Sequence, residues 1–228
     1  MTDVDANDRE PGPTWRGRVV SRTLDTARTR AEQRAQRLLD AAFQIMDDKG
    51  TTEFTILDVV SRAKQSLRTF YQCFDSKDEL LLALFEETIR EAVDELRAAV
   101  DAEDAPLARL RAFVVSLHEQ CDPELAARRP DAHNRRPISE FSLELARSHP
   151  EQVEAMFAPI SQLLADLVNE AKRAGQIDWP DTRVATALLL RCVVSTWFED
   201  RLTRSAGLRI SAEDSWQFCL RALQGHTG

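Results

Sequence analysis

The sequence lacks the motifs from which most catalytic and metal sites are built. It has seven glycines among 228 residues and contains no GxSxG, HExxH, phosphate-cradling glycine loop or nucleotide-binding fingerprint. The four cysteines lie too far apart for a zinc ribbon or a CxxC redox pair: Cys73, Cys121, Cys192 and Cys219. We therefore expect a protein that is not an enzyme, with no metal, no cofactor and reduced cysteines.

Long apolar runs are also missing. No uninterrupted hydrophobic segment approaches the roughly 20 residues that a membrane-spanning helix needs, and the N-terminus shows no signal-peptide pattern. Hydrophobic residues nevertheless make up 43% of the chain, which is enough for a sizeable buried core. We therefore expect a cytoplasmic protein of one or two domains.

Helical signals follow one another closely between residues 55 and 84. Thr55 can cap a first short helix. Apolar residues in this helix recur at i, i+3, i+4 and i+7 and give it one buriable face: Ile56, Val59, Val60 and Ala63. Phe70 and Phe74 are four residues apart, so they can share a face of a second helix over about 66–73. The other face of that second helix is polar, aromatic and basic.

Two further helices flank this pair. Downstream, Ser76 and Glu79 form a capping-box pattern ahead of a long helix over about 77–100. Upstream, apolar residues with helical spacing stop near Gly50, which can end a helix: Leu38, Leu39, Ala42, Phe43 and Met46. A supporting helix, a tight turn and a polar second helix are typical of a helix-turn-helix, whose second helix enters a DNA major groove.

Residues 38–84, LLDAAFQIMDDKGTTEFTILDVVSRAKQSLRTFYQCFDSKDELLLAL, resemble the N-terminal domain of the TetR family of bacterial transcriptional regulators without a gap. The match includes the DAA, KG, TFY and FxSK elements. Where the family usually has glycine and valine in the turn, this chain has Lys64 and Gln65, and Cys73 stands where a second aromatic residue is common. Lysine lacks the freedom of glycine at positive φ, so we expect a mildly strained or rebuilt turn.

The resemblance implies which side chains lie nearest the major groove. Arg68 has the planar fork that matches guanine, whereas Gln72 can bind adenine and Leu67 can touch a thymine methyl group. The alternative for Arg68 is that it meets only phosphate. The full set nearest the groove is Gln65, Ser66, Leu67, Arg68, Thr69 and Gln72.

Three other side chains suit phosphate binding. Thr55 and Lys77 stand at helix starts, and Tyr71 stands on the flank of the second helix. Hydroxyl and ammonium groups at such positions orient a protein on DNA rather than discriminate bases. The alternatives are that Thr55 only caps its helix and that Tyr71 packs its ring.

Negative charge is concentrated outside this module. Of the net charge of −8, residues 80–228 contribute −7, from 17 basic and 24 acidic residues. Residues 16–37 carry seven arginines and two acidic residues, a net charge of +5, which would orient the protein on a polyanion. We interpret residues 1–28 as a flexible basic arm that either reaches a minor groove or remains a solvated tail.

The remaining chain is again predicted to be helical. The sequence therefore predicts an all-α protein with a three-helix helix-turn-helix domain over 29–78 and a second helical domain over 79–228. The resemblance implies that this second domain is a ligand-binding and dimerisation domain. Helices over about 181–202 and from Ser211 onward are apolar on more than one face. The resemblance implies that they pack against the same pair of a second subunit, giving a homodimer on a palindromic operator. A monomeric core is the alternative.

The resemblance also implies that a small-molecule effector binds in the second domain. The candidate lining is aromatic and sulfur-rich, which indicates an apolar or amphipathic compound. The alternative for every member is ordinary core packing. The candidates are Phe113, Leu117, His118, Cys121, Phe141, Met156, Phe157, Leu163, Cys192, Val193 and Trp197.

These observations together favour a sequence-specific, DNA-binding transcriptional regulator, in the form of a repressor that an effector releases from its operator. The alternative is a helical protein-interaction module without DNA binding.

Overall fold

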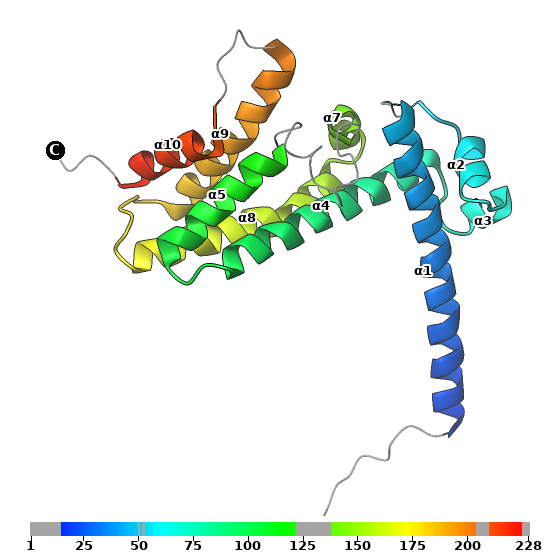
Figure 1. Cartoon of the computed structure of the whole chain (residues 1–228). Helices are drawn as coiled ribbons and strands as arrows, with labels where there is room; N and C mark the ends of the chain where they lie inside the picture. Colours follow the sequence, from blue (N-terminus) through cyan, green and yellow to red (C-terminus); the bar gives the residue numbers. More distant parts are fainter. Residues whose placement is uncertain (1–14, 50, 52, 122–137, 204–209, 225–228) are drawn as a thin grey trace, which may run out of the picture.

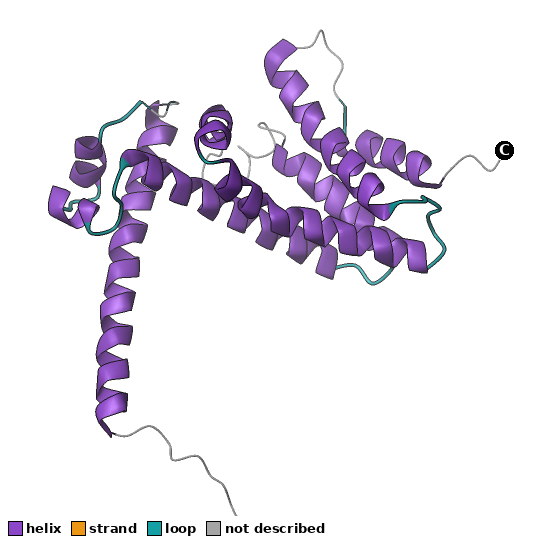
Figure 2. Ribbon diagram, turned by 180° about the vertical axis from the view of Figure 1, so that it is seen from behind, coloured by secondary structure: helices purple, strands orange, loops and turns teal. Residues whose placement is uncertain are grey.

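The computed structural model describes residues 15–49, 51, 53–121, 138–203 and 210–224, and all of these that adopt regular structure are helical (Figures 1 and 2). The prediction of an all-α fold is therefore confirmed. None of the helices in these ranges is long and apolar enough to cross a membrane. Their bounds are α1 Trp15–Lys49, α2 Ile56–Arg62, α3 Leu67–Tyr71, α4 Lys77–Asp101, α5 Pro106–Cys121, α7 Ile138–Ser148, α8 Pro150–Arg173, α9 Thr182–Thr203 and α10 Ala212–Gln224.

A first hydrophobic core joins the C-terminal part of α1 to α2, α3 and the start of α4. Leu38, Ala42, Val59 and Phe70, which the helical spacing identified, are fully buried in it, as are Leu80 and Leu84 of α4. Three helices of these lengths cannot bury enough surface alone, so the first turns of α4 complete the domain.

A second core fills the space between the C-terminal half of α4 and helices α5, α8, α9 and α10. It is built from aliphatic side chains and one phenylalanine, with Trp216 of α10 also buried. Its most deeply buried members include Leu96, Val100, Leu110, Phe113, Leu164, Leu167 and Val168. α7 and the start of α8 belong instead to the first core, through Leu145 and Val153.

α1 is much longer than the sequence predicted. We expected a flexible arm to about residue 28, but α1 begins at Trp15, so the second half of that segment is helical. From Thr23 to Arg34 every residue is exposed, and this part of α1 projects away from the rest of the protein (Figure 1). A helix that is solvated on all sides has no apolar period, so the pattern by which the other helices were recognised is absent here.

Candidate nucleic-acid interface

The turn between α2 and α3 is closed by two backbone hydrogen bonds. The Gln65 N–H donates to the Val60 carbonyl at 2.9 Å, and the Lys64 N–H donates to the Ser61 carbonyl at 3.2 Å. This is the Schellman pattern, which requires a left-handed residue after the helix end. Lys64 supplies it with φ of 53°. The turn is therefore strained at Lys64, as the sequence predicted.

The short helix α3 is fixed at its start and along one face. Ser66 is its N-cap, and the Ser66 hydroxyl oxygen accepts a hydrogen bond from the Thr69 N–H at 3.1 Å. Phe70 is fully buried, and its ring packs on that of Phe74 with 5.8 Å between the centroids. A helix of five residues has little intrinsic stability, so these contacts hold it in place.

The opposite face of α3 is open to solvent. Leu67 is 42% exposed and Tyr71 is 55% exposed. Arg68 and Gln72 are exposed beside them, and among the described residues Arg68 takes part in no salt bridge. The structure thus brings four of the predicted DNA-contacting side chains together on one open surface.

Gln65 has a different position from the one expected. It is half-buried, and its side-chain amide donates to the Arg34 carbonyl of α1 at 3.0 Å. That bond joins the turn to α1, so Gln65 holds the start of α3 against α1. The sequence did not show this because the two partners are 31 residues apart.

The two remaining phosphate candidates at helix starts have structural roles as well. The Thr55 hydroxyl oxygen accepts a bond from the Asp58 N–H at 3.1 Å, and the Asp58 carboxylate accepts one from the Thr55 N–H at 2.8 Å, a complete capping box. The second bond lowers the pKa of Asp58 below its usual value, opposed by some desolvation and helped by nearby Lys49. Lys77 places its ammonium group 4.6 Å from the centre of the Phe54 ring.

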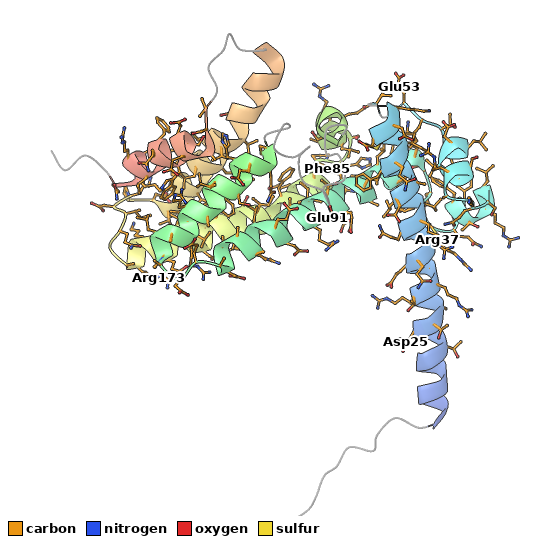
Figure 3. The ribbon with its side chains drawn as sticks, viewed as in Figure 1. Asp25, Arg37, Glu53, Phe85, Glu91 and Arg173 are labelled. Atoms are coloured by element: carbon orange, nitrogen blue, oxygen red, sulfur yellow. The ribbon has the colours of Figure 1, made fainter. Side chains whose placement is uncertain are left out.

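Arginines of α1 continue this surface. Arg30, Arg34 and Arg37 are exposed and follow one another at i, i+4 and i+7, so they form one stripe along the helix; Figure 3 labels Arg37. Arg34 is close enough to the end of α3 for its charge to act on the Cys73 thiol, whose pKa is raised mainly by burial and lowered somewhat by that charge. We call these three residues the α1 arginine stripe.

One exposed residue was missed by the sequence analysis. Leu57 of α2 is 62% exposed and occupies the side of α2 opposite the buried Val59. In the sequence, Leu57 falls outside the i, i+3, i+4, i+7 pattern of apolar residues in this helix. That is the only sequence signal that could have identified it as an exposed leucine of the helix-turn-helix.

The predicted effector residues that the structure describes lie in different surroundings. Phe113, Leu117 and Val193 are buried in the second core, with Cys121, Leu163 and Cys192 partly buried against it. Met156 packs instead against the first core, and the side chains of Phe141 and Trp197 lie outside what the structure describes. Among the described candidates, Cys192 lines the cavity of about 60 Å³ between α9 and α10.

Two of these candidates make contacts that explain their positions. His118 is buried, and its Nδ1 lies 3.1 Å from the Ser215 hydroxyl, so the pair joins α5 to α10. Phe157 of α8 packs against Phe85 of α4 with 5.8 Å between the ring centroids. Both contacts link helices that are distant in sequence, and neither requires an effector.

Comparison with known proteins agrees with this geometry. A model of the family described as "Bacterial regulatory proteins, tetR family" matches residues 38–84. The nicotine-responsive transcriptional repressor HdnoR of Paenarthrobacter nicotinovorans is 32% identical over 71 residues, which are 31% of this chain and 37% of HdnoR. The transcriptional regulator TtgR of Pseudomonas putida is 24% identical over 183 residues, covering 78% of this chain and 85% of TtgR.

Solved structures show the same fold. The transcriptional regulator FadR of Bacillus subtilis, in complex with stearoyl-CoA, is similar over 85% of this chain and 99% of FadR, with a TM-score of 0.62 and 17% identity. The relatives named here are regulators rather than enzymes, as we expected of this chain. The chain spans less than half the length of HdnoR, and about 85% of TtgR.

The strain at Lys64 can be measured, because the chain contains the same turn with glycine. At the end of α8, Gly175 has φ of 70° within an identical pair of backbone bonds. Lys64→Gly should raise the free energy of unfolding by up to about 1 kcal/mol, since relief of left-handed strain exceeds the added entropy of the unfolded chain. Chemical denaturation followed by circular dichroism measures it.

Two variants control for other causes. Lys64→Ala removes the charge and keeps the strained backbone, so it should lie close to the wild type. Gly175→Ala should be destabilising, although an added Cβ would meet nothing within 4 Å. If Lys64→Gly proves no more stable than Lys64→Ala, the backbone at this turn is not strained.

Proposed function

We propose that this chain, which belongs to the TetR family of bacterial regulatory proteins, is a homodimeric repressor that binds a palindromic operator through α3 and leaves it when an apolar or amphipathic effector binds. The observation that carries the proposal is the open face of α3. Leu67, Arg68 and Gln72 stand exposed on a helix whose other side is anchored by buried Phe70. A rigid helix with an apolar contact, a guanidinium and an amide is suited to reading base edges in a major groove.

The α1 arginine stripe supports the same conclusion. Arg34 lies against the turn that starts α3, because its carbonyl accepts the Gln65 bond. Arg30 and Arg37 lie on the same side of α1, one turn away in either direction. DNA seated on α3 would meet these charges along its phosphate backbone, so the stripe would add affinity without base preference.

A dimer is supported by the surface of α9 and α10. Large apolar side chains stand exposed on both helices, with Leu188 50% exposed and Phe218 66% exposed. Val184 and Val194 of α9 are exposed as well. Packing this surface against its copy in a second subunit would remove it from water and set two α3 helices in two-fold relation.

Control by an effector is supported by a contact between α8, which contributes to the second core, and the part of α4 that lies in the first core. Phe157 of α8 packs on Phe85 of α4, so a rearrangement of α8 acts directly on the helix that completes the first core. FadR of Bacillus subtilis, which has this fold, was solved with stearoyl-CoA. An effector of this chain would favour release from DNA only by binding more tightly to the released arrangement.

Base reading by Arg68 can be tested on duplexes selected from a random-sequence pool. Wild-type protein should enrich a palindrome. Arg68→Ala should lose preference at one base position in each half-site, at a cost of about 1–3 kcal/mol there. The control is Arg62→Ala, since Arg62 of α2 is bound to Asp48 at 2.9 Å.

A uniform loss of affinity across all sequences would make Arg68 a phosphate contact. Failure of the wild type to enrich any sequence would favour the alternative of an interaction module without DNA binding.

The α1 arginine stripe is tested by salt dependence. Replacing Arg30, Arg34 and Arg37 by glutamine should weaken binding to the selected duplex and flatten the plot of log affinity against log salt, by about 0.9 for each phosphate that is no longer neutralised. Arg97→Gln, an exposed arginine in the second half of α4, should leave the slope unchanged. An unaltered slope in the triple variant would show that the stripe does not touch DNA.

The dimer is tested by placing a charge on its proposed surface. Leu188→Glu should convert a dimer at micromolar concentration into a monomer in sedimentation velocity, because an unpaired carboxylate would be buried in the interface. Leu57→Glu makes the same change at a similarly exposed leucine of α2 and should leave the dimer intact. A wild-type protein that sediments as a monomer would count against the proposal.

A further inference from the structure

Two cysteines face each other across α9 and α10, and the function proposed above does not use them. Cys192 of α9 is half-buried and Cys219 of α10 is buried. Both line the cavity of about 60 Å³ between these helices, whose rim carries the exposed Leu188 and Phe218. The sequence could not reveal this pair, because 27 residues separate its members and no CxxC spacing marks them.

The two thiols interact directly. Burial, together with the charge and the side-chain hydrogen bond of adjacent Cys192, raises the pKa of Cys219 to about 12. Neighbouring residues fix this arrangement. Leu189 and Val193 of α9 are buried beside Cys192, and Leu223, one turn beyond Cys219 on α10, is buried with them. The two thiols therefore lie next to each other where the helices pack around the cavity.

The pair is distinct from the other cysteines of the chain. Cys73 packs against the first core, at the end of α3. Cys121 ends α5 and packs against the second core outside the cavity lining. The two members of the pair also differ in access, since Cys192 is partly open to solvent and Cys219 is enclosed. A small oxidant would reach Cys192 first, with Cys219 at hand to resolve the product.

We propose that Cys192 and Cys219 are a thiol pair that a hydroperoxide converts into a disulfide within one subunit. The Cys192 thiolate attacks one peroxide oxygen, the O–O bond breaks, and a sulfenic acid forms while water or an alcohol leaves. Cys219 then attacks the Cys192 sulfur, the S–O bond breaks, and a water molecule departs with the Cys219 proton. Two thiols lose two electrons in total, and the hydroperoxide gains them.

The bond would join α9 to α10 directly beneath Leu188 and Phe218. If that surface forms the dimer proposed above, oxidation fixes one particular spacing of the two helices in each subunit and so alters the dimer and its DNA affinity. This consequence rests on the proposed function. Formation of the disulfide does not, and it is measured without DNA.

In the test, the reduced, full-length wild-type protein is treated with hydrogen peroxide, and the remaining thiols are then blocked by alkylation. The intact mass and the peptide map of the product are recorded. The expected product has lost the mass of two hydrogen atoms, carries two alkyl groups instead of four, and yields one linked peptide pair containing Cys192 and Cys219. Dithiothreitol added before the alkylation step should restore all four thiols, so that the protein then carries four alkyl groups.

Matched variants locate the chemistry. Cys73→Ser with Cys121→Ser should give the same product, because both sites lie outside the cavity lining. Cys219→Ser should leave Cys192 as a sulfenic acid that dimedone traps, and Cys192→Ser should leave Cys219 unreacted. Circular dichroism checks the fold of each variant. If a variant fails to fold, the peptide map of the wild-type protein decides whether the disulfide forms.

Two results would overturn the proposal. One is oxidation of wild-type Cys192 to sulfinic acid while Cys219 remains a free thiol. The other is a disulfide between two subunits through Cys192, which non-reducing electrophoresis would show as a covalent dimer. Because neither measurement depends on operator binding, failure of the disulfide and failure of the proposed regulator are told apart.

Discussion

The structure depends on one helix that is buried at both ends in different cores. Leu80 and Leu84 near the start of α4 are fully enclosed in the first core, and Leu96 and Val100 near its end are enclosed in the second. A helix of 25 residues spans roughly 37 Å at about 1.5 Å per residue. Removing α4 from either core would leave a cavity there, and a tilt of α4 would displace residues in both cores. The orientation of α3 is thereby tied to the packing of the second domain.

A second contact between the domains limits how α4 can move. Leu145 of α7 and Val153 of α8 are buried in the first core, and Phe157 packs on Phe85 one turn beyond. The first core is therefore held by the first turns of α4 and, from the side, by the α7–α8 corner. Close-packed contacts of this kind shift between discrete arrangements rather than deform continuously, which is the property a two-state regulator needs.

The parts that the sequence predicted well are those encoded by neighbouring residues. The caps at Thr55 and Ser76 and the apolar spacing of α2 to α4 are local, so they located α2, α3 and the start of α4. The exposed half of α1 left no apolar period to recognise. The roles of Gln65 and His118 depend on partners 31 and 97 residues away, which helical spacing does not report. The same limit applies to the effector set, which stays a prediction: Met156 and Leu163 both belong to α8 but pack against different cores.

The departure at Lys64 shows how an unfavourable residue can leave the shape of the site intact. The turn is held by the two backbone bonds from Lys64 and Gln65, and by the Gln65 side chain on α1. None of these bonds involves the lysine side chain, so the backbone has the same course that glycine would give it, as the matching turn at Gly175 shows. The strain is about 1–2 kcal/mol and is a cost to the stability of the fold. The position of Ser66, and with it the start of α3, is set by bonds that do not depend on which residue occupies the left-handed position.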